Sequence, residues 1–150
     1  MRLFVGVWPP SDVLNAVAAL PRAGEARWTR RDQWHVTLLF IGEVDDPAPW
    51  VARVQDVAAS CGARTVTLGR ATRRLGRDIL VLPASGLDDI AAAFGNDRFR
   101  GHLTLARNAP SHLAGDAFEA SFEVRDIALI RSHLGNGPAR YETIATATLG

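Results

Sequence analysis

"WHVTLLFIG", residues 34–42, reads as a buried β-strand interrupted near its start by a histidine and, two positions later, a threonine. The stretch "GHLTLAR", residues 101–107, repeats this His-x-Thr arrangement. With four histidines and nine threonines in 150 residues, roughly 0.24 such matches are expected by chance. Two matches, both with an apolar middle residue and a following leucine, indicate a shared role.

Each motif places its two polar side chains on one face of a strand, because residues two apart on a strand point the same way. His35 therefore projects with Thr37, and His102 with Thr104. If the two strands meet, two imidazoles and two hydroxyls converge on one cleft. One imidazole can take a proton from water while the other gives one to a departing oxygen, since an ordinary histidine pKa of about 6.5 permits both roles. The hydroxyls can hold the oxygens of a reacting oxyanion.

The segments around the motifs form a weak internal repeat that predicts two similar lobes. Both "LFVGVWPPSDVLNAVAAL" and "ILVLPASGLDDIAAAF" read as strand, proline-containing turn, serine cap and short helix, and a His-x-Thr strand follows each. The predicted caps are Ser11 and Ser85. The predicted strands cover 2–8, 34–42, 64–72, 78–83, 101–107, 118–132 and 139–149, and the predicted helices cover 12–20, 47–60 and a short segment after Ser85.

Composition indicates one globular domain over residues 1–150, with 47% hydrophobic residues and no linker. No apolar run approaches the roughly 20 residues that cross a bilayer, so we expect no membrane partner. The single cysteine, Cys61, excludes an internal disulfide framework. The N-terminus lacks the features of a signal peptide, and we expect a cytoplasmic protein with no obligate protein partner.

The net charge of +1 argues against a large nucleic-acid-wrapping surface, but arginines cluster locally. One cluster is Arg27, Arg30 and Arg31, and a second lies within 64–77. Guanidinium groups match phosphate oxygens and could guide a polyanion. All 17 basic residues are arginine, so the choice of arginine at one position carries little information. We interpret both clusters as solvated basic faces rather than a specific RNA track.

Other catalytic arrangements fit the sequence less well. A zinc site needs three or four ligands, and no carboxylate or thiolate stands at ligand spacing near the histidines. The G-x-S-x-G elbow of serine hydrolases is absent, as are the P-loop and the G-x-G-x-x-G motif. We therefore expect no metal and no cofactor.

The motifs "HVTL" and "HLTL", with "RLFVGV" at the start, resemble the 2H phosphoesterase superfamily. The longer stretches "WHVTLLFIGEV", "RFRGHLTLAR" and "ALIRSHLGNGPARYETIA" resemble the RNA 2′,3′-cyclic phosphodiesterases, also called 2′-5′ RNA ligases. The similarity covers nearly the whole chain. It implies an α+β fold of two pseudo-two-fold related antiparallel sheets with helices packed outside and the active site in the central cleft.

The resemblance also implies a reaction and a set of roles. A terminal 2′,3′-cyclic phosphate on RNA or a nucleotide would be hydrolysed to a 2′-phosphomonoester without a metal. His35 would be the proton donor and His102 the proton acceptor. Phosphate would be bound by Thr37, Thr104 and Arg107, and the last of these stands on the strand offset from the His-Thr face. Apart from the resemblance, the candidates for stacking on a base are Tyr141, Trp34 and Phe4; core packing is the favoured role for Trp34 and Phe4, and both roles stay open for Tyr141.

Two alternatives stay open. The same residues would serve 2′-5′ RNA ligation, in which an RNA 5′-hydroxyl replaces water. A non-catalytic module that binds RNA ends or nucleotides would keep the threonine and arginine contacts without needing both histidines. The physiological substrate and the oligomeric state do not follow from the sequence.

Overall fold

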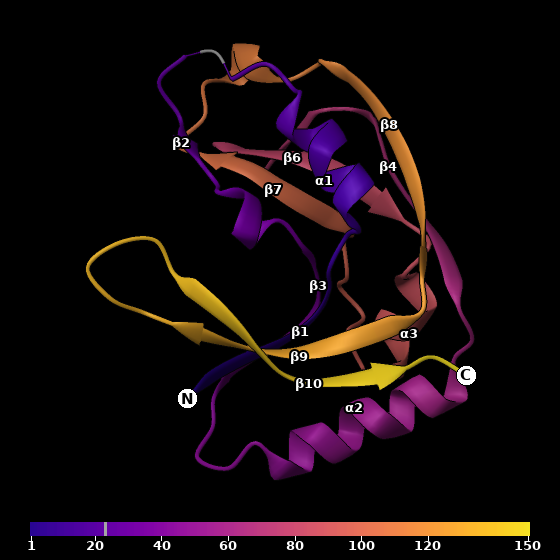
Figure 1. Ribbon diagram of the computed structural model, residues 1–150. Helices are drawn as coiled ribbons and strands as arrows, with labels where there is room; N and C mark the ends of the chain where they lie inside the picture. Colours follow the sequence, from indigo (N-terminus) through magenta and orange to yellow (C-terminus); the bar gives the residue numbers. More distant parts are fainter. Residues whose placement is uncertain (23) are drawn as a thin grey trace.

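The computed structural model describes residues 1–22 and 24–150, and within these residues it has ten strands, three α-helices and two 3₁₀ helices (Figure 1). In chain order they are β1 (Arg2–Val7), α1 (Ser11–Ala18), β2 (Arg27–Trp28), η1 (Arg31–Gln33), β3 (Val36–Glu43), α2 (Ala48–Ser60), β4 (Arg64–Ala71), β5 (Arg73–Leu75), β6 (Ile79–Ser85), α3 (Asp88–Ala93), β7 (His102–Arg107), η2 (Ser111–Leu113), β8 (Ala117–Val124), β9 (Asp126–His133) and β10 (Arg140–Thr148).

The strands form one curled antiparallel sheet in the order β10-β9-β1-β3-β7-β6-β4-β8, with β2 on β7 and β5 on β6. It divides into two four-stranded halves, each containing one His-x-Thr strand. The halves join between β3 and β7, where Val36 pairs with Leu103. This arrangement confirms the predicted α+β fold with two antiparallel lobes.

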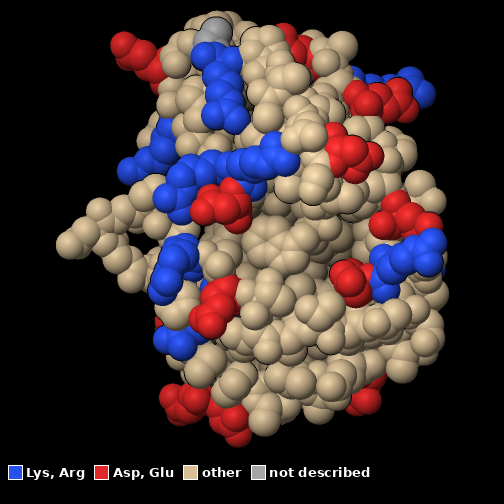
Figure 2. Space-filling view, viewed as in Figure 1, with Lys and Arg blue, Asp and Glu red and all other residues tan. Residues whose placement is uncertain are grey.

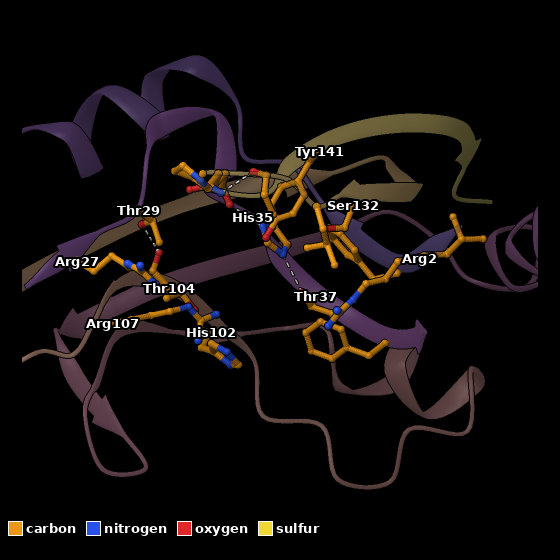
Figure 3. A pocket seen from close by; sticks show the side chains of 18 of the residues that line it. Arg2, Arg27, Thr29, His35, Thr37, His102, Thr104, Arg107, Ser132 and Tyr141 are labelled. Atoms are coloured by element: carbon orange, nitrogen blue, oxygen red, sulfur yellow. Dashed lines mark hydrogen bonds between the residues drawn. The ribbon is translucent and has the colours of Figure 1, made fainter. Parts of the chain in front are cut away.

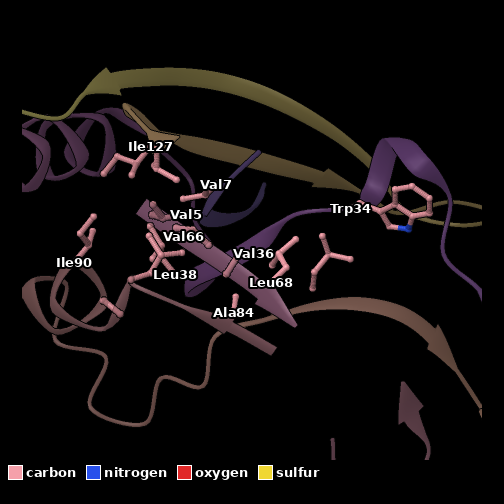
Figure 4. Close-up of a cluster of buried hydrophobic side chains, with 14 of the residues drawn as sticks. Val5, Val7, Trp34, Val36, Leu38, Val66, Leu68, Ala84, Ile90 and Ile127 are labelled. Carbon is pink, nitrogen blue, oxygen red and sulfur yellow. The ribbon is translucent and has the colours of Figure 1, made fainter. Parts of the chain in front are cut away.

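The core runs through both halves of the sheet (Figure 4). Val36 and Leu103, the pair at the junction, are fully buried on the face away from the motif side chains. Helix α2 buries Val54 and Val57 and packs along β9 and β10. Helix α1 precedes β3 in the sequence but contacts β8 in the other half. Apolar burial of this kind is the main force that fixes the relative position of the two motifs.

Both predicted serine caps are wrong. Ser11 is the first residue of α1, its N-cap is Pro10, and no side chain caps the helix. Ser85 ends β6, where it pairs with Thr67, and the N-cap of α3 is Leu87. Pairing with a neighbouring strand satisfies the backbone at this position, so the strand extends to the residue where a helix was expected to begin.

The predicted strand 118–132 is two strands, because the chain passes from one half of the sheet to the other at Arg125. β8 pairs with β4, whereas β9 pairs with β1 and β10. No glycine or proline marks the change, and the local sign of it is that two polar residues, Arg125 and Asp126, stand together where apolar and polar residues had alternated. The short strands β2 and β5 were also not predicted; they are two and three residues long, too short for periodicity to show.

Candidate active site

The two His-x-Thr motifs meet at the junction of the sheet halves (Figure 3). Because Val36 lies opposite Leu103 in an antiparallel pair, the residues on either side also lie across from each other. His35 is therefore next to Thr104, and Thr37 is next to His102. The four side chains line one cleft and are related by a local two-fold axis through the Val36–Leu103 pair.

Both imidazoles are held in the same way by the backbone. Nδ1 of His35 lies 2.6 Å from the carbonyl oxygen of Gln33, and Nδ1 of His102 lies 2.7 Å from that of Arg100. A carbonyl oxygen can only accept, so each Nδ1 carries the hydrogen. Each Nε2 is then the atom that can exchange a proton with a ligand. In both cases the carbonyl belongs to the residue two positions before the histidine, just before the strand begins.

The two Nε2 atoms differ in what they contact. Nε2 of His35 accepts a hydrogen bond from the hydroxyl of Thr37 at 2.8 Å. Nε2 of His102 has no hydrogen-bond partner within the described residues. The Thr104 hydroxyl is available to donate a hydrogen bond to a ligand. The Thr37 hydroxyl can do the same only after it gives up its hydrogen bond to His35.

Three aromatic rings surround His35. The ring centroid of Phe4 lies 4.9 Å from that of His35, with Tyr141 at 5.2 Å and Trp8 at 5.7 Å. Burial lowers the pKa of His35 to about 4, and the nearby His102 and Arg107 act in the same direction, against the Gln33 carbonyl. His35 is consequently neutral at pH 7 in the free protein.

Arg107 reaches the cleft because of a β-bulge. On β7 the pairing with β6 goes from Thr104 directly to Ala106, so Leu105 is an extra residue. The bulge reverses the alternation of side chains. Arg107, three residues after Thr104, then shares its face and lines the cleft. The sequence predicted this residue but placed it off the motif face, because the prediction assumed uninterrupted alternation through the adjacent apolar residues Leu105 and Ala106.

Phe40 is a cleft residue that the sequence analysis missed. The pairing of β3 with β1 skips Leu38, so Thr37 lies opposite Gly6 and Phe40 opposite Phe4. Gly6 and Phe4 share a face of β1, and Phe40 therefore lies on the same face as Thr37. Its side chain is 73% exposed and lines the cleft. It follows Thr37 by three residues, just as Arg107 follows Thr104, and this matched spacing was the available signal.

The predicted stacking residues have three different positions. Trp34 is 2% exposed and does not line the cleft, so it is no stacking surface and has the core role that the sequence favoured. Its indole is part of the core, and its Nε1 donates to the hydroxyl of Thr29 at 3.0 Å. Phe4 lines the cleft but is 4% exposed and packs against His35. Tyr141 is half-buried at the cleft wall, where burial raises the pKa of its phenol.

The cleft has a volume of about 770 Å³ and contains no aspartate or glutamate among the described residues that line it. Its charged side chains are Arg2, Arg27 and Arg107. Arg27 was interpreted from the sequence as part of a solvated face; it is exposed, as expected, and it also lines the cleft. Figure 2 shows arginines gathered on the side of this face where Figure 1 places β2 and the β9–β10 hairpin. Such a cleft is suited to an anion.

Two further properties concern the part of the chain that the structure describes. No group of three or more histidine, cysteine, aspartate or glutamate residues there could hold a metal ion. None of the helices described is both long and apolar enough to cross a membrane.

Comparison with known proteins finds solved structures of the same fold and a family model that covers the first His-x-Thr motif. The sequence model of the family described as LigT like phosphoesterase matches residues 7–73, which include His35 and Thr37. The structure of TT0787 from Thermus thermophilus is 25% identical, with a TM-score of 0.85 over 99% of this chain and 98% of that chain. E. coli LigT complexed with ATP is 25% identical, with a TM-score of 0.80 over 99% and 96%. The LigT complex with 3′-AMP is 23% identical, with a TM-score of 0.80 over 99% and 97%. No curated protein matches the chain significantly.

Proposed function

We propose that this chain is a LigT-like phosphoesterase that hydrolyses 2′,3′-cyclic phosphates of RNA ends or nucleotides to 2′-phosphomonoesters without a metal ion. The observation that carries the proposal is the pair of imidazoles that are both anchored through Nδ1 and share one acid-free cleft. Paired proton donors and acceptors of this kind are what in-line displacement at phosphorus needs.

In the proposed step, Nε2 of His102 takes a proton from a water molecule whose oxygen forms a new bond to phosphorus. The bond between phosphorus and the 3′ oxygen breaks, and that oxygen receives the proton from Nε2 of His35. The products are a 2′-phosphate and a 3′-hydroxyl. His35 ends neutral and His102 protonated, and proton exchange with solvent restores both. The free Nε2 of His102 supports its role as the base.

The acid role of His35 depends on the substrate's charge. With a pKa of about 4 in the free protein, the imidazole lacks the proton that it has to donate. A bound phosphate brings negative charge next to the ring and favours the protonated form. Protonation at Nε2 also ends the acceptance from Thr37, whose hydroxyl then becomes free to donate to a phosphate oxygen. Thr104 and Arg107 would bind the remaining oxygens.

The exposed ring of Phe40 is the best-placed surface in the cleft for stacking on a nucleobase. Solved relatives support nucleotides as the ligand class, because E. coli LigT has been crystallised with 3′-AMP, NADP+ and ATP. A cleft with Phe40 and Arg2 at one end, Arg27 and Arg107 at the other and two histidines between them fits a nucleotide bearing a phosphate.

The test is turnover of a short RNA that ends in a 2′,3′-cyclic phosphate, in EDTA, with the position of the product phosphate identified. We expect a 2′-phosphate, and a loss of about 10²- to 10⁴-fold in His35→Ala and in His102→Ala. His133→Ala is the matched control, because that histidine bonds Glu142 outside the cleft. Loss of activity in EDTA, or a 3′-phosphate product, would contradict the proposal. Adding an RNA with a 5′-hydroxyl tests ligation in the same reaction.

The assignment of acid and base has its own test. A phosphodiester with a p-nitrophenolate leaving group needs no proton donor at the departing oxygen. We expect His35→Ala to retain most of its activity on such a substrate, whereas His102→Ala does not. The opposite result would reverse the two roles while leaving the reaction unchanged.

A further inference from the structure

Two arginines lie directly opposite each other at one end of the cleft. β2 pairs with β7 so that Arg27 faces Arg107, and both side chains line the cleft. Neither forms a salt bridge with a carboxylate in the described residues. Like charges directly opposite on neighbouring strands destabilise a sheet. A bound anion between the two guanidinium groups would remove this cost.

The chain holds Arg27 at this position with several hydrogen bonds. The backbone N–H of Thr29 donates to the carbonyl of Leu105 at 2.9 Å, and the Thr29 hydroxyl lies 2.8 Å from the carbonyl of Thr104. The Thr29 oxygen in turn accepts from Nε1 of Trp34. The buried indole therefore supports the segment that carries Arg27. A two-residue strand anchored this firmly gives its arginine a fixed place beside Arg107.

The position of Arg27 separates it from the reacting phosphate. The histidines lie beside the Val36–Leu103 pair, whereas Arg27 pairs four residues farther along β7, roughly 13 Å away for extended backbone. The side chain of Arg107 extends toward His35, because its charge helps to lower the pKa of His35. Arg27 is not among the groups that lower this pKa. Figure 3 shows both arginines on the same side of the motif residues. Arg27 is thus placed for an anion next to the one that reacts.

Building on the proposed function, we propose that Arg27, next to the Arg107 that holds the reacting phosphate, binds the 3′,5′-phosphodiester that precedes the terminal nucleotide, and that the enzyme therefore prefers RNA ends to mononucleotides. The two-fold relation between the lobes supports this division of the cleft. Phe40 occupies in one half the position that Arg107 occupies in the other. The end with Phe40 is suited to the terminal base, although it also contains Arg2, and this leaves the end with the paired arginines Arg27 and Arg107 for the preceding nucleotide. A 2′,3′-cyclic mononucleotide has no 3′,5′-phosphodiester for Arg27 to bind.

The test compares a 2′,3′-cyclic mononucleotide with a trinucleotide RNA that ends in the same cyclic phosphate. For Arg27→Gln we expect kcat/KM to fall roughly 10- to 100-fold on the RNA, the effect of one lost charge-assisted hydrogen bond, and less than about threefold on the mononucleotide. The salt dependence of log kcat/KM on the RNA should flatten by about 0.7. Arg27→Lys should keep that slope. Arg73→Gln is the matched control, because Arg73 is exposed and outside the cleft.

An equal loss on both substrates, or no loss on the RNA, would overturn the inference. Binding of RNA and mononucleotide 2′-phosphates, measured by fluorescence anisotropy and calorimetry, makes the same comparison without turnover. If the wild type turns over neither substrate, the proposed function fails, and weaker binding of the RNA alone by Arg27→Gln still supports the arginine site. If Arg27→Gln leaves binding of the RNA unchanged, the site is refuted whatever the activity.

Discussion

Replacing His35 by glutamine should change how the stability of this protein depends on pH. The imidazole is enclosed by the rings of Phe4, Trp8 and Tyr141, and burial lowers its pKa from 6.5 to about 4. Between these two values the unfolded chain binds a proton that the folded protein does not. Stability contributed by the neutral buried ring is therefore complete above pH 6.5 and is lost as the pH falls toward 4.

The size of this effect follows from the two pKa values. A difference of about 2.5 units corresponds to at most about 3 kcal/mol, and about 2 kcal/mol of it falls between pH 7 and pH 4.5. Glutamine has no titrating group in this range. The free energy of unfolding of the variant should thus change less on acidification, by about 2 kcal/mol, than that of the wild type. Carboxylates that titrate in the same range are common to both proteins and cancel in the difference.

Urea unfolding at pH 7 and pH 4.5, followed by tryptophan fluorescence, measures both free energies. Thr37→Val is the control, because it removes the hydroxyl partner of His35 but leaves the imidazole buried. We expect its acid dependence to follow the wild type. If His35→Gln and the wild type lose stability in parallel, burial does not keep this ring neutral, and the need for phosphate to protonate it loses its basis.

Three other predictions rest on single contacts. The affinity for a nucleoside 2′-phosphate should rise as the pH falls from 7 to 5.5, by up to about tenfold per unit, and His35→Gln should remove this rise in calorimetric titrations. Phe40→Ala should raise KM roughly tenfold or more through lost stacking, with stability changed by less than about 0.5 kcal/mol because the ring is exposed; an unchanged KM would refute the stacking role. Thr29→Val should lower the free energy of unfolding by about 1–3 kcal/mol, since Nε1 of Trp34 loses its acceptor, and a variant as stable as the wild type would show that water replaces it.

The grouping of the candidate catalytic side chains was largely predictable from the sequence. The pairing of His35 with Thr37, and of His102 with Thr104, follows from the two-residue period of a strand, and the structure brings all four side chains into one cleft. The two lobes were predicted from an internal repeat, and most strands lie close to where alternation placed them. These features depend on neighbours within a few residues, so the local sequence contains the information.

Other features of the site depended on strand pairing between distant segments. The bulges that place Phe40 and Arg107 on the motif face arise from the registers of β3 on β1 and β7 on β6. The opposition of Arg27 to Arg107 comes from a two-residue strand that exists only because it pairs with β7. Core packing of Trp34 was favoured from the sequence, but its support of the segment next to that strand, through Thr29, follows only from the tertiary structure. A single sequence encodes which face a side chain takes along its own strand, but register and bulges depend on the free energy of packing two segments against each other. That free energy is decided only when the whole chain folds.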